Sequence, residues 1–139
     1  SFLPEDRGTS HFSVVDHWGN AVACTETINT YFGSKVTVPG TGIVLNDEMD
    51  DFSVQPGVPN FYGLVGSEAN SIAPGKKPLS SMTPTIILKE GKPVLVVGAS
   101  GGPRIITGTL QTILNVLDFG MDIESAISAP RIHHRLCLM

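Results

Sequence analysis

The chain is poor in cysteine and aromatic residues and carries no excess of positive charge. Its 139 residues include 2 cysteines, 1 tryptophan and 2 tyrosines, and charged residues make up 16%. Cys24 and Cys137 lie far apart in sequence, so they define no disulfide framework, and two free thiols are the expected state. The net charge of −4 supplies no basic field for a nucleic acid, and none is expected as a partner.

Long apolar runs are also missing. No stretch reaches the roughly 20 apolar residues that a membrane-spanning helix needs, so no membrane span is expected. Ser1 to Gly8 is too short and too acidic to be a secretory signal peptide. Hydrophobic residues nevertheless make up 41% of the chain, beside 15 glycines and 10 prolines. This composition indicates one globular, loop-rich domain with a hydrophobic core.

Residue patterns predict two hairpins and a long loop. Residues 11–15 and 21–28 read as paired strands around a turn at Asp16-His17-Trp18-Gly19-Asn20. Residues 85–89 and 94–97 form a second, more apolar pair, which is expected to be covered on both faces. Residues 43–45 predict a short buried strand. The segment 53–78 has few strand or helix formers, and loops of this length are often functional lids.

Two helices are predicted to follow the second hairpin. The first starts after Gly101-Gly102, with Pro103 in its first turn, and ends at Phe119-Gly120. Asp122 starts a second, shorter helix, which Ala129-Pro130 ends. Apolar residues at helical spacing form one stripe on the first helix: Ile105, Ile106, Thr109, Leu110, Ile113, Leu114 and Leu117. Strands followed by helices that lie on a sheet favour a layered α+β architecture.

A threonine stands at the start of the first predicted strand, in Gly8-Thr9-Ser10. A threonine hydroxyl is a weak nucleophile without a base beside it, and the α-amine of a chain-terminal threonine can be that base. An α-amine has a pKa of about 7.7–8.0, so part of it is neutral near pH 7. This chemistry requires cleavage of the Gly8–Thr9 bond. The local sequence alone favours the simpler alternative that Thr9 is a polar residue opening a strand.

Further polar groups could serve such a nucleophile. Thr27 and Asn29 lie on one side of the returning strand, where Thr27 could orient Thr9, although ordinary strand positions are the commoner explanation. Glu48, Asp50 and Asp51 form an acidic cluster, which is either a solvated turn or a clamp for an ammonium group.

Hydroxyls and glycine amides complete the set. Ser80 and Ser81 can both donate to a carboxylate, or are turn serines. Gly101 and Gly102 precede a helix, where amides suit an anion or an oxyanion, and a Walker A spacing is absent. The four histidines show no metal-ligand spacing, so no metal is expected.

Together these blocks resemble the catalytic small subunit of gamma-glutamyltransferases (gamma-glutamyltranspeptidases). The resemblance runs from about Thr9 to the Ala129-Pro130-Arg131-Ile132-His133-His134 stretch. It implies a partial αββα sandwich of the N-terminal-nucleophile hydrolase type. Residues 1–8 would then be the tail or linker of a large subunit that precedes the cleavage site, and residues 9–139 a truncated small-subunit domain.

The resemblance also implies a role for each motif. Thr9 would be the self-liberating nucleophile, supported by Thr27, and Tyr62 would belong to a lid formed by the 53–78 loop. Glu48 and Asp51 would hold the substrate α-ammonium, although some family members carry Gln at the former position. The remaining residues would bind the substrate or the oxyanion: Asn29, the carboxylate ligands Ser80 and Ser81 (with an arginine of the large subunit), and Gly101 and Gly102 as the oxyanion hole.

The implied activity is cleavage of a γ-glutamyl amide of glutathione-like compounds, with transfer of the glutamyl group to water or an amine and no cofactor. Partners would be the large subunit and the small-molecule substrate, at a periplasmic or extracellular location. With Thr9 inside a peptide bond, the uncut chain is expected to be inactive. The alternatives are a cephalosporin acylase or polyglutamate transferase relative, a non-catalytic paralogue, and a free-standing anion-binding domain.

Overall fold

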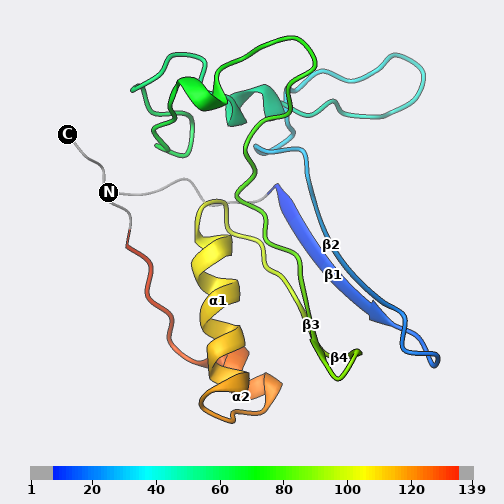
Figure 1. The fold of residues 1–139 in the computed structure, drawn as a ribbon. Helices are drawn as coiled ribbons and strands as arrows, with labels where there is room; N and C mark the ends of the chain where they lie inside the picture. The colour runs from blue at the N-terminus through cyan, green and yellow to red at the C-terminus, as the bar shows by residue number, and fades with distance from the viewer. Residues whose placement is uncertain (1–7, 135–139) are drawn as a thin grey trace. The chain divides into compact units, whose positions relative to one another are not determined.

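The computed structural model describes residues 8–134. The expected pre-cleavage segment 1–8 therefore lies outside the described residues except for Gly8, and so does Cys137. Along the chain the elements are β1 (Thr9–Val15), β2 (Ala21–Thr27), η1 (Glu48–Asp51), η2 (Glu68–Asn70), β3 (Thr85–Lys89), β4 (Lys92–Val97), α1 (Arg104–Leu117) and α2 (Ile123–Ser128) (Figure 1). Between residues 8 and 134, no helix is both long and apolar enough to cross a membrane.

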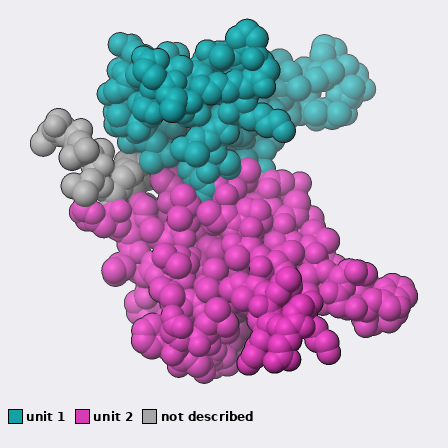
Figure 2. Space-filling view, viewed as in Figure 1, with its two compact units in different colours: residues 1–9, 27–81, 135–139 teal, residues 10–26, 82–134 magenta. Residues whose placement is uncertain are grey.

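The chain divides into two compact units (Figure 2). The first unit holds Ser1–Thr9, Thr27–Ser81 and Arg135–Met139, and the second holds Ser10–Glu26 and Met82–His134. Both helices and the β3–β4 hairpin belong to the second unit. The first unit is mostly irregular, with the two short 3₁₀ helices η1 and η2 as its regular elements among the described residues.

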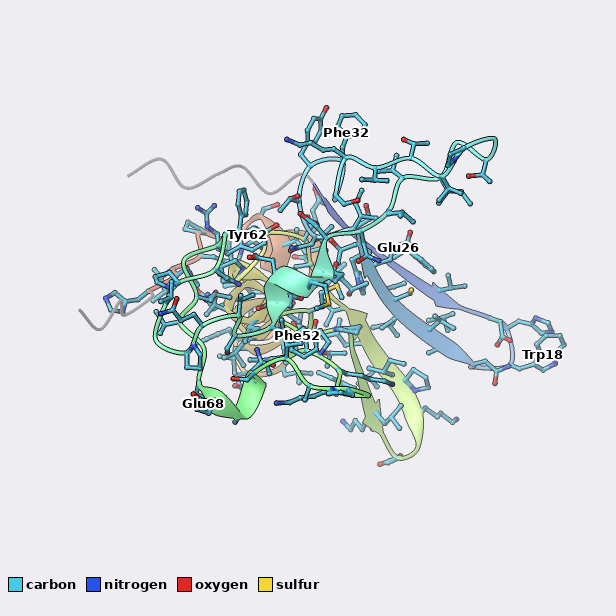
Figure 3. The ribbon with its side chains drawn as sticks, turned by 90° about the horizontal axis from the view of Figure 1, so that it is seen from above. Trp18, Glu26, Phe32, Phe52, Tyr62 and Glu68 are labelled. Carbon is cyan, nitrogen blue, oxygen red and sulfur yellow. The ribbon has the colours of Figure 1, made fainter. Side chains whose placement is uncertain are left out.

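The first predicted hairpin is confirmed, because β1 and β2 form a two-stranded sheet. Its turn is fixed by the Asp16 carboxylate, whose Oδ1 accepts hydrogen bonds from the amides of Trp18 and Asn20, each 2.9 Å long. The Asn20 side chain also donates to it, and these bonds lower the pKa of Asp16. Gly19 completes the turn with a φ of 87°, a conformation that favours glycine. Trp18 lies 77% exposed at the tip (Figure 3).

The second predicted hairpin is also present, and it is covered on one face. β3 and β4 pair antiparallel around a tight turn, with Thr85 opposite Val97. Leu95 and Val97 are buried, each 9% exposed. The expectation that both faces are covered is wrong within residues 8–134, because apolar side chains of both strands remain exposed: Ile86, Leu88 and Val94.

The two predicted helices are confirmed, and α1 packs against β4 and α2. Only part of the expected apolar stripe is buried: Ile105 is 1% exposed, whereas Ile106 is 46% exposed. α2 starts as predicted, since the Asp122 side chain accepts a hydrogen bond of 2.9 Å from the Ser125 amide. A bond from the Ser125 hydroxyl and this capping bond lower the pKa of Asp122.

The first unit is held together by loops rather than by a sheet. Phe52 and Ser53, which directly follow η1, are both buried, at 7% and 5% exposed. The predicted buried strand at residues 43–45 is wrong, because Val44 forms only an isolated bridge with Thr37. Ile43 and Leu45 on either side of it are exposed. A short apolar run becomes a buried strand only where a second layer covers it.

Two neighbouring isoleucines on α1 offer a matched test of this packing. Ile105→Ala should lower the free energy of unfolding by about 2–5 kcal/mol, because it opens a cavity in a fully buried position. Ile106→Ala removes the same atoms from a half-exposed position and should cost about 0.5 kcal/mol. Urea denaturation of both variants measures the difference. Equal losses would contradict the burial described for α1.

Candidate active site

The hydroxyl of Thr27 connects three groups around the Gly8–Thr9 bond. Thr9 Oγ1 donates a hydrogen bond of 3.1 Å to Thr27 Oγ1. Thr27 Oγ1 in turn donates a bond of 3.0 Å to the carbonyl oxygen of Gly8 and accepts one of 2.8 Å from the Asn29 amide. The predicted nucleophile and its predicted supporting hydroxyl are therefore in direct contact, beside the carbonyl that a cleavage reaction would attack.

Asn29 follows β2 in a strained, buried conformation. Its φ is 73° and it is 4% exposed. Its side-chain amide donates a bond of 3.2 Å to the carbonyl oxygen of Asp47. A Cβ on Gly8 would lie 2.5 Å from the carbonyl oxygen of Asn29, so a glycine at position 8 permits this close approach. A non-glycine residue in the left-handed region is often found where function constrains the backbone.

Tyr62 extends from the long loop to the same residue. Its hydroxyl donates a bond of 2.7 Å to the carbonyl oxygen of Asn29, and the side chain is labelled in Figure 3. The loop around Tyr62 is anchored by Asp50, whose carboxylate accepts hydrogen bonds from the Phe61 amide at 3.1 and 3.3 Å. Asp50 thus holds the predicted lid, a role that its place in an acidic cluster did not suggest.

Asp47 is a structural residue that the sequence patterns did not single out. Its carboxylate accepts bonds from the amide and the hydroxyl of Thr30, and its carbonyl oxygen accepts the Asn29 side chain. Asp47 therefore fixes the turn after β2. The sequence signal for this role is the short polar pair Asn46-Asp47 in front of η1, since such residues bond nearby backbone amides.

Glu48 and Asp51 form a pair of carboxyl groups on η1. Burial, a hydrogen bond to Asp51 and the negative charges of Asp51 and Asp47 raise the pKa of Glu48 from 4.5 to about 8. Burial also raises the pKa of Asp51. Glu48 Oε1 is buried without a hydrogen-bond partner in the described part of the chain. Two close carboxyls with an unpaired oxygen suit a cation, which would stabilise the ionised form of both.

Asp51 also lines a small cavity in the first unit. The cavity has a volume of about 250 Å³, and Ser53 and Ser81 face it as well. Ser80 is exposed and is not part of the lining. Asp51 and Ser81 thus share one cavity wall, whereas Glu48, Asn29 and Tyr62 are absent from it. Polar groups that converge on a concave space are typical of small-molecule sites.

Gly101 and Gly102 belong to the second unit, in the loop between β4 and α1. Their φ values are 132° and 55°, which favour glycine at both positions. Their carbonyl oxygens accept the amides of Arg104 and Ile105, each at 3.1 Å, so the loop runs directly into α1. The loop also lines a cavity of about 500 Å³. Amides at the start of a helix favour negative charge.

Comparison with known proteins places these features in a family context. Residues 3–139 match the sequence profile described as gamma-glutamyltranspeptidase. The chain is 57% identical over 131 residues to a glutathione hydrolase proenzyme of Pseudomonas sp. (strain A14), covering 94% of this chain. It spans only 23% of the length of that curated relative.

Solved structures give the same result. A point mutant of the gamma-glutamyltranspeptidase of Helicobacter pylori shares 58% sequence identity, with a TM-score of 0.87 over 90% of this chain and 67% of that chain. The gamma-glutamyltranspeptidase of Pseudomonas nitroreducens complexed with L-DON shares 54% identity, with a TM-score of 0.88 over 91% of this chain and 66% of that chain.

The raised pKa of Glu48 predicts how stability depends on pH. Between pH 4.5 and about 8 the folded chain keeps a proton on Glu48 that the unfolded chain has released. The free energy of unfolding therefore falls as pH rises through this window. Glu48→Gln has no such proton, so its free energy of unfolding should fall less steeply with pH. The slope that remains comes from Asp51, whose pKa is also raised.

Urea denaturation at a series of pH values from about 5 to about 8 measures this slope. Glu68→Gln, an exposed position of the same unit, is the control and should keep the slope of the unmodified chain. An unchanged slope in Glu48→Gln would show that Glu48 does not hold the proton.

Proposed function

The chain belongs to the gamma-glutamyltranspeptidase family, and from that premise we propose that it carries the nucleophile and much of the substrate site of an enzyme that cleaves γ-glutamyl amides. The observation that supports this most strongly is the contact of 3.1 Å between the hydroxyls of Thr9 and Thr27, next to the Gly8 carbonyl. It combines a nucleophile, a group that orients it, and a peptide bond whose cleavage would liberate it.

Maturation would begin at the Gly8–Thr9 bond. Thr9 Oγ1 attacks the Gly8 carbonyl carbon, and the hydrogen bond from Thr27 to the Gly8 oxygen stabilises the charge that develops there. The C–N bond then breaks, and the nitrogen of Thr9 takes up the proton that its hydroxyl gave up, which frees the α-amine. Water then hydrolyses the resulting ester, which releases the Gly8 carboxylate and restores the Thr9 hydroxyl. That amine is the base that a threonine nucleophile needs.

Turnover would use the same hydroxyl on a second amide. Thr9 Oγ1 attacks the γ-carbonyl carbon of a glutathione-like substrate while the α-amine accepts its proton, and the leaving amine then takes up a proton. The amides of Gly101 and Gly102 would stabilise the tetrahedral oxyanion, and one such donor is worth about 3 kcal/mol of barrier. The γ-glutamyl ester on Thr9 then passes to water or to an amine.

Recognition of glutamate would rest on its two α-substituents. Glu48 and Asp51 would bind the α-ammonium, which displaces the proton that Glu48 holds in the free protein. Ser80 and Ser81 would donate to the α-carboxylate together with an arginine of the large subunit. Asn29 would contact the substrate directly, and Tyr62 would cover it as part of the 53–78 lid.

A related acylase that acts on side chains without an α-ammonium is the main competing function. A γ-glutamyl anilide and a glutaryl anilide differ by that ammonium group alone, so a comparison of their kcat/KM values separates the two. The acidic pair Glu48–Asp51 favours the γ-glutamyl compound, since a buried carboxylate loses stabilisation when no cation faces it. Equal kcat/KM values would favour the acylase, and no hydrolysis of either a non-catalytic paralogue.

The nucleophile assignment predicts a specific loss of activity. In the full-length polypeptide that contains this sequence, Thr9→Ala should reduce release of glutamate from glutathione to the uncatalysed rate, because no other hydroxyl takes its place. Ser10→Ala removes the neighbouring exposed hydroxyl and is the control, with activity close to the unmodified enzyme. Residual turnover in Thr9→Ala would exclude the mechanism.

Thr27 is predicted to act on the cleavage step itself. Thr27→Val keeps the shape of the side chain but removes the donor to the Gly8 oxygen and the acceptor for Thr9, so cleavage should slow by about 100-fold or more. Thr27→Ser retains the hydroxyl and should cleave at a similar rate to the unmodified chain. A gel time course of precursor loss gives both rates. Similar rates for Val and Ser would show that the hydroxyl is not needed.

A further inference from the structure

His11 on β1 lies against the loop that leads to the two glycines. A Cβ built on Gly98 would fall 2.3 Å from both Cε1 and Nδ1 of the His11 ring. No carbon atom fits at that distance, so the imidazole occupies the space that any side chain at position 98 would need. Gly98 directly follows β4, which ends at Val97, and begins the path to Gly101 and Gly102.

Hydroxyl groups hold the ring of His11 on both edges. Nδ1 lies 2.8 Å from Thr25 Oγ1 on β2, and Nε2 lies 3.0 Å from Ser13 Oγ on β1. Ser13 Oγ donates its own proton to the carbonyl oxygen of Val96, 3.2 Å away on β4. The chain of hydrogen bonds therefore runs from β2 through the imidazole and β1 to β4, all within the second unit.

The same chain of bonds fixes the tautomer of His11. Because the Ser13 hydroxyl gives its single proton to the Val96 carbonyl, its oxygen is the acceptor towards the ring, and Nε2 carries the proton. In the neutral ring Nδ1 is then the acceptor, and the Thr25 hydroxyl donates to it. A ring with both nitrogens engaged has one orientation, so it presents a fixed surface to Gly98.

We propose that His11 is a positioning residue for the Gly98–Gly102 loop. Its ring, locked by Thr25 and Ser13, sets where the backbone leaves β4 and thereby aims the amides of Gly101 and Gly102. The inference rests on the proposed function in that these amides serve as the oxyanion hole. Errors of about 1 Å in such a constellation can cost about 100-fold in rate, so a rigid support two residues beyond Thr9 on the same strand has a direct catalytic consequence.

A double-mutant cycle in the full-length protein tests the contact. His11→Ala removes the ring, and Gly98→Ala adds a methyl group where the ring lies. Each should lower kcat by about 10- to 100-fold while KM changes by less than about threefold, because the glycines act on the transition state rather than on ground-state binding. The three atoms nearest to a Cβ at position 98 all belong to the His11 ring, so His11→Ala removes this clash and the double variant should be no slower than His11→Ala alone.

Gly108→Ala is the matched control, because a Cβ at that position on α1 meets no atom within 4 Å. Its kcat and KM should stay unchanged. Losses in kcat that simply multiply in the double variant would overturn the proposal, as would a rise in KM without a fall in kcat.

Amide hydrogen exchange gives a readout that does not depend on activity. His11→Ala should increase exchange at residues 98–102 and leave the β3 amides as protected as before. Unchanged exchange at residues 98–102 would overturn the positioning role even if the enzyme is active. If His11→Ala increases exchange at residues 98–102 but Thr9→Ala still hydrolyses substrate, the positioning role of His11 stands and the proposed function is refuted.

Discussion

The arrangement around Thr9 depends on one hydroxyl group. Thr27 Oγ1 accepts from Thr9, donates to the Gly8 carbonyl and accepts from the Asn29 amide. It is in this position because β2 returns beside β1 and ends at Thr27. Asn29, two residues further along, has a left-handed backbone conformation. Its side chain donates to the Asp47 carbonyl oxygen, and its own carbonyl oxygen accepts the Tyr62 hydroxyl. A single side chain thus connects the end of β2, the candidate scissile bond and, through Asn29, the loop that carries Tyr62.

Two carboxyl groups of the first unit, those of Glu48 and Asp51, have raised pKa values. Burial raises the pKa of both Glu48 and Asp51, and negative charges nearby add to it: those of Asp51 and Asp47 for Glu48, and those of Asp50 and Asp47 for Asp51. Two half-buried carboxyl groups side by side lower the stability of the fold when no cation faces them, and a bound ammonium would offset that loss. Asp50, between them in sequence, instead holds the Phe61 amide. The acidic cluster therefore divides into a pair available to a ligand and one residue that anchors the loop.

Much of this organisation was predictable from local sequence. Both hairpins and both helices follow from turn residues, an Asp cap and apolar periodicity. The family resemblance was predicted from the joint occurrence of Thr9, the acidic cluster, the serine pair and the glycine pair, and it is confirmed. The chain shares the partial α+β fold of N-terminal-nucleophile hydrolases. Burial was less predictable: Ile43 and Leu45 in the predicted 43–45 strand and Ile86, Leu88 and Val94 of the β3–β4 hairpin are exposed, because burial depends on which other segments cover an apolar run.

The role of His11 shows a different limit of sequence reasoning. A histidine in an alternating strand looks structural, and only the distance to Gly98 shows what its ring supports. In the same way, no sequence pattern singled out Asp47, and only its bonds to Thr30 show that it fixes the turn after β2. Side chains that act by holding a backbone are invisible in a pattern of residue types, since their effect depends on contacts across strands.

The central claim is that Thr9 liberates itself as a nucleophile. The most direct test is the intact mass of the full-length polypeptide under denaturing conditions, after prolonged incubation of the folded protein. The account predicts two fragments whose masses correspond to cleavage between Gly8 and Thr9. A single uncut chain from a correctly folded protein would contradict it and would favour a non-catalytic binding module.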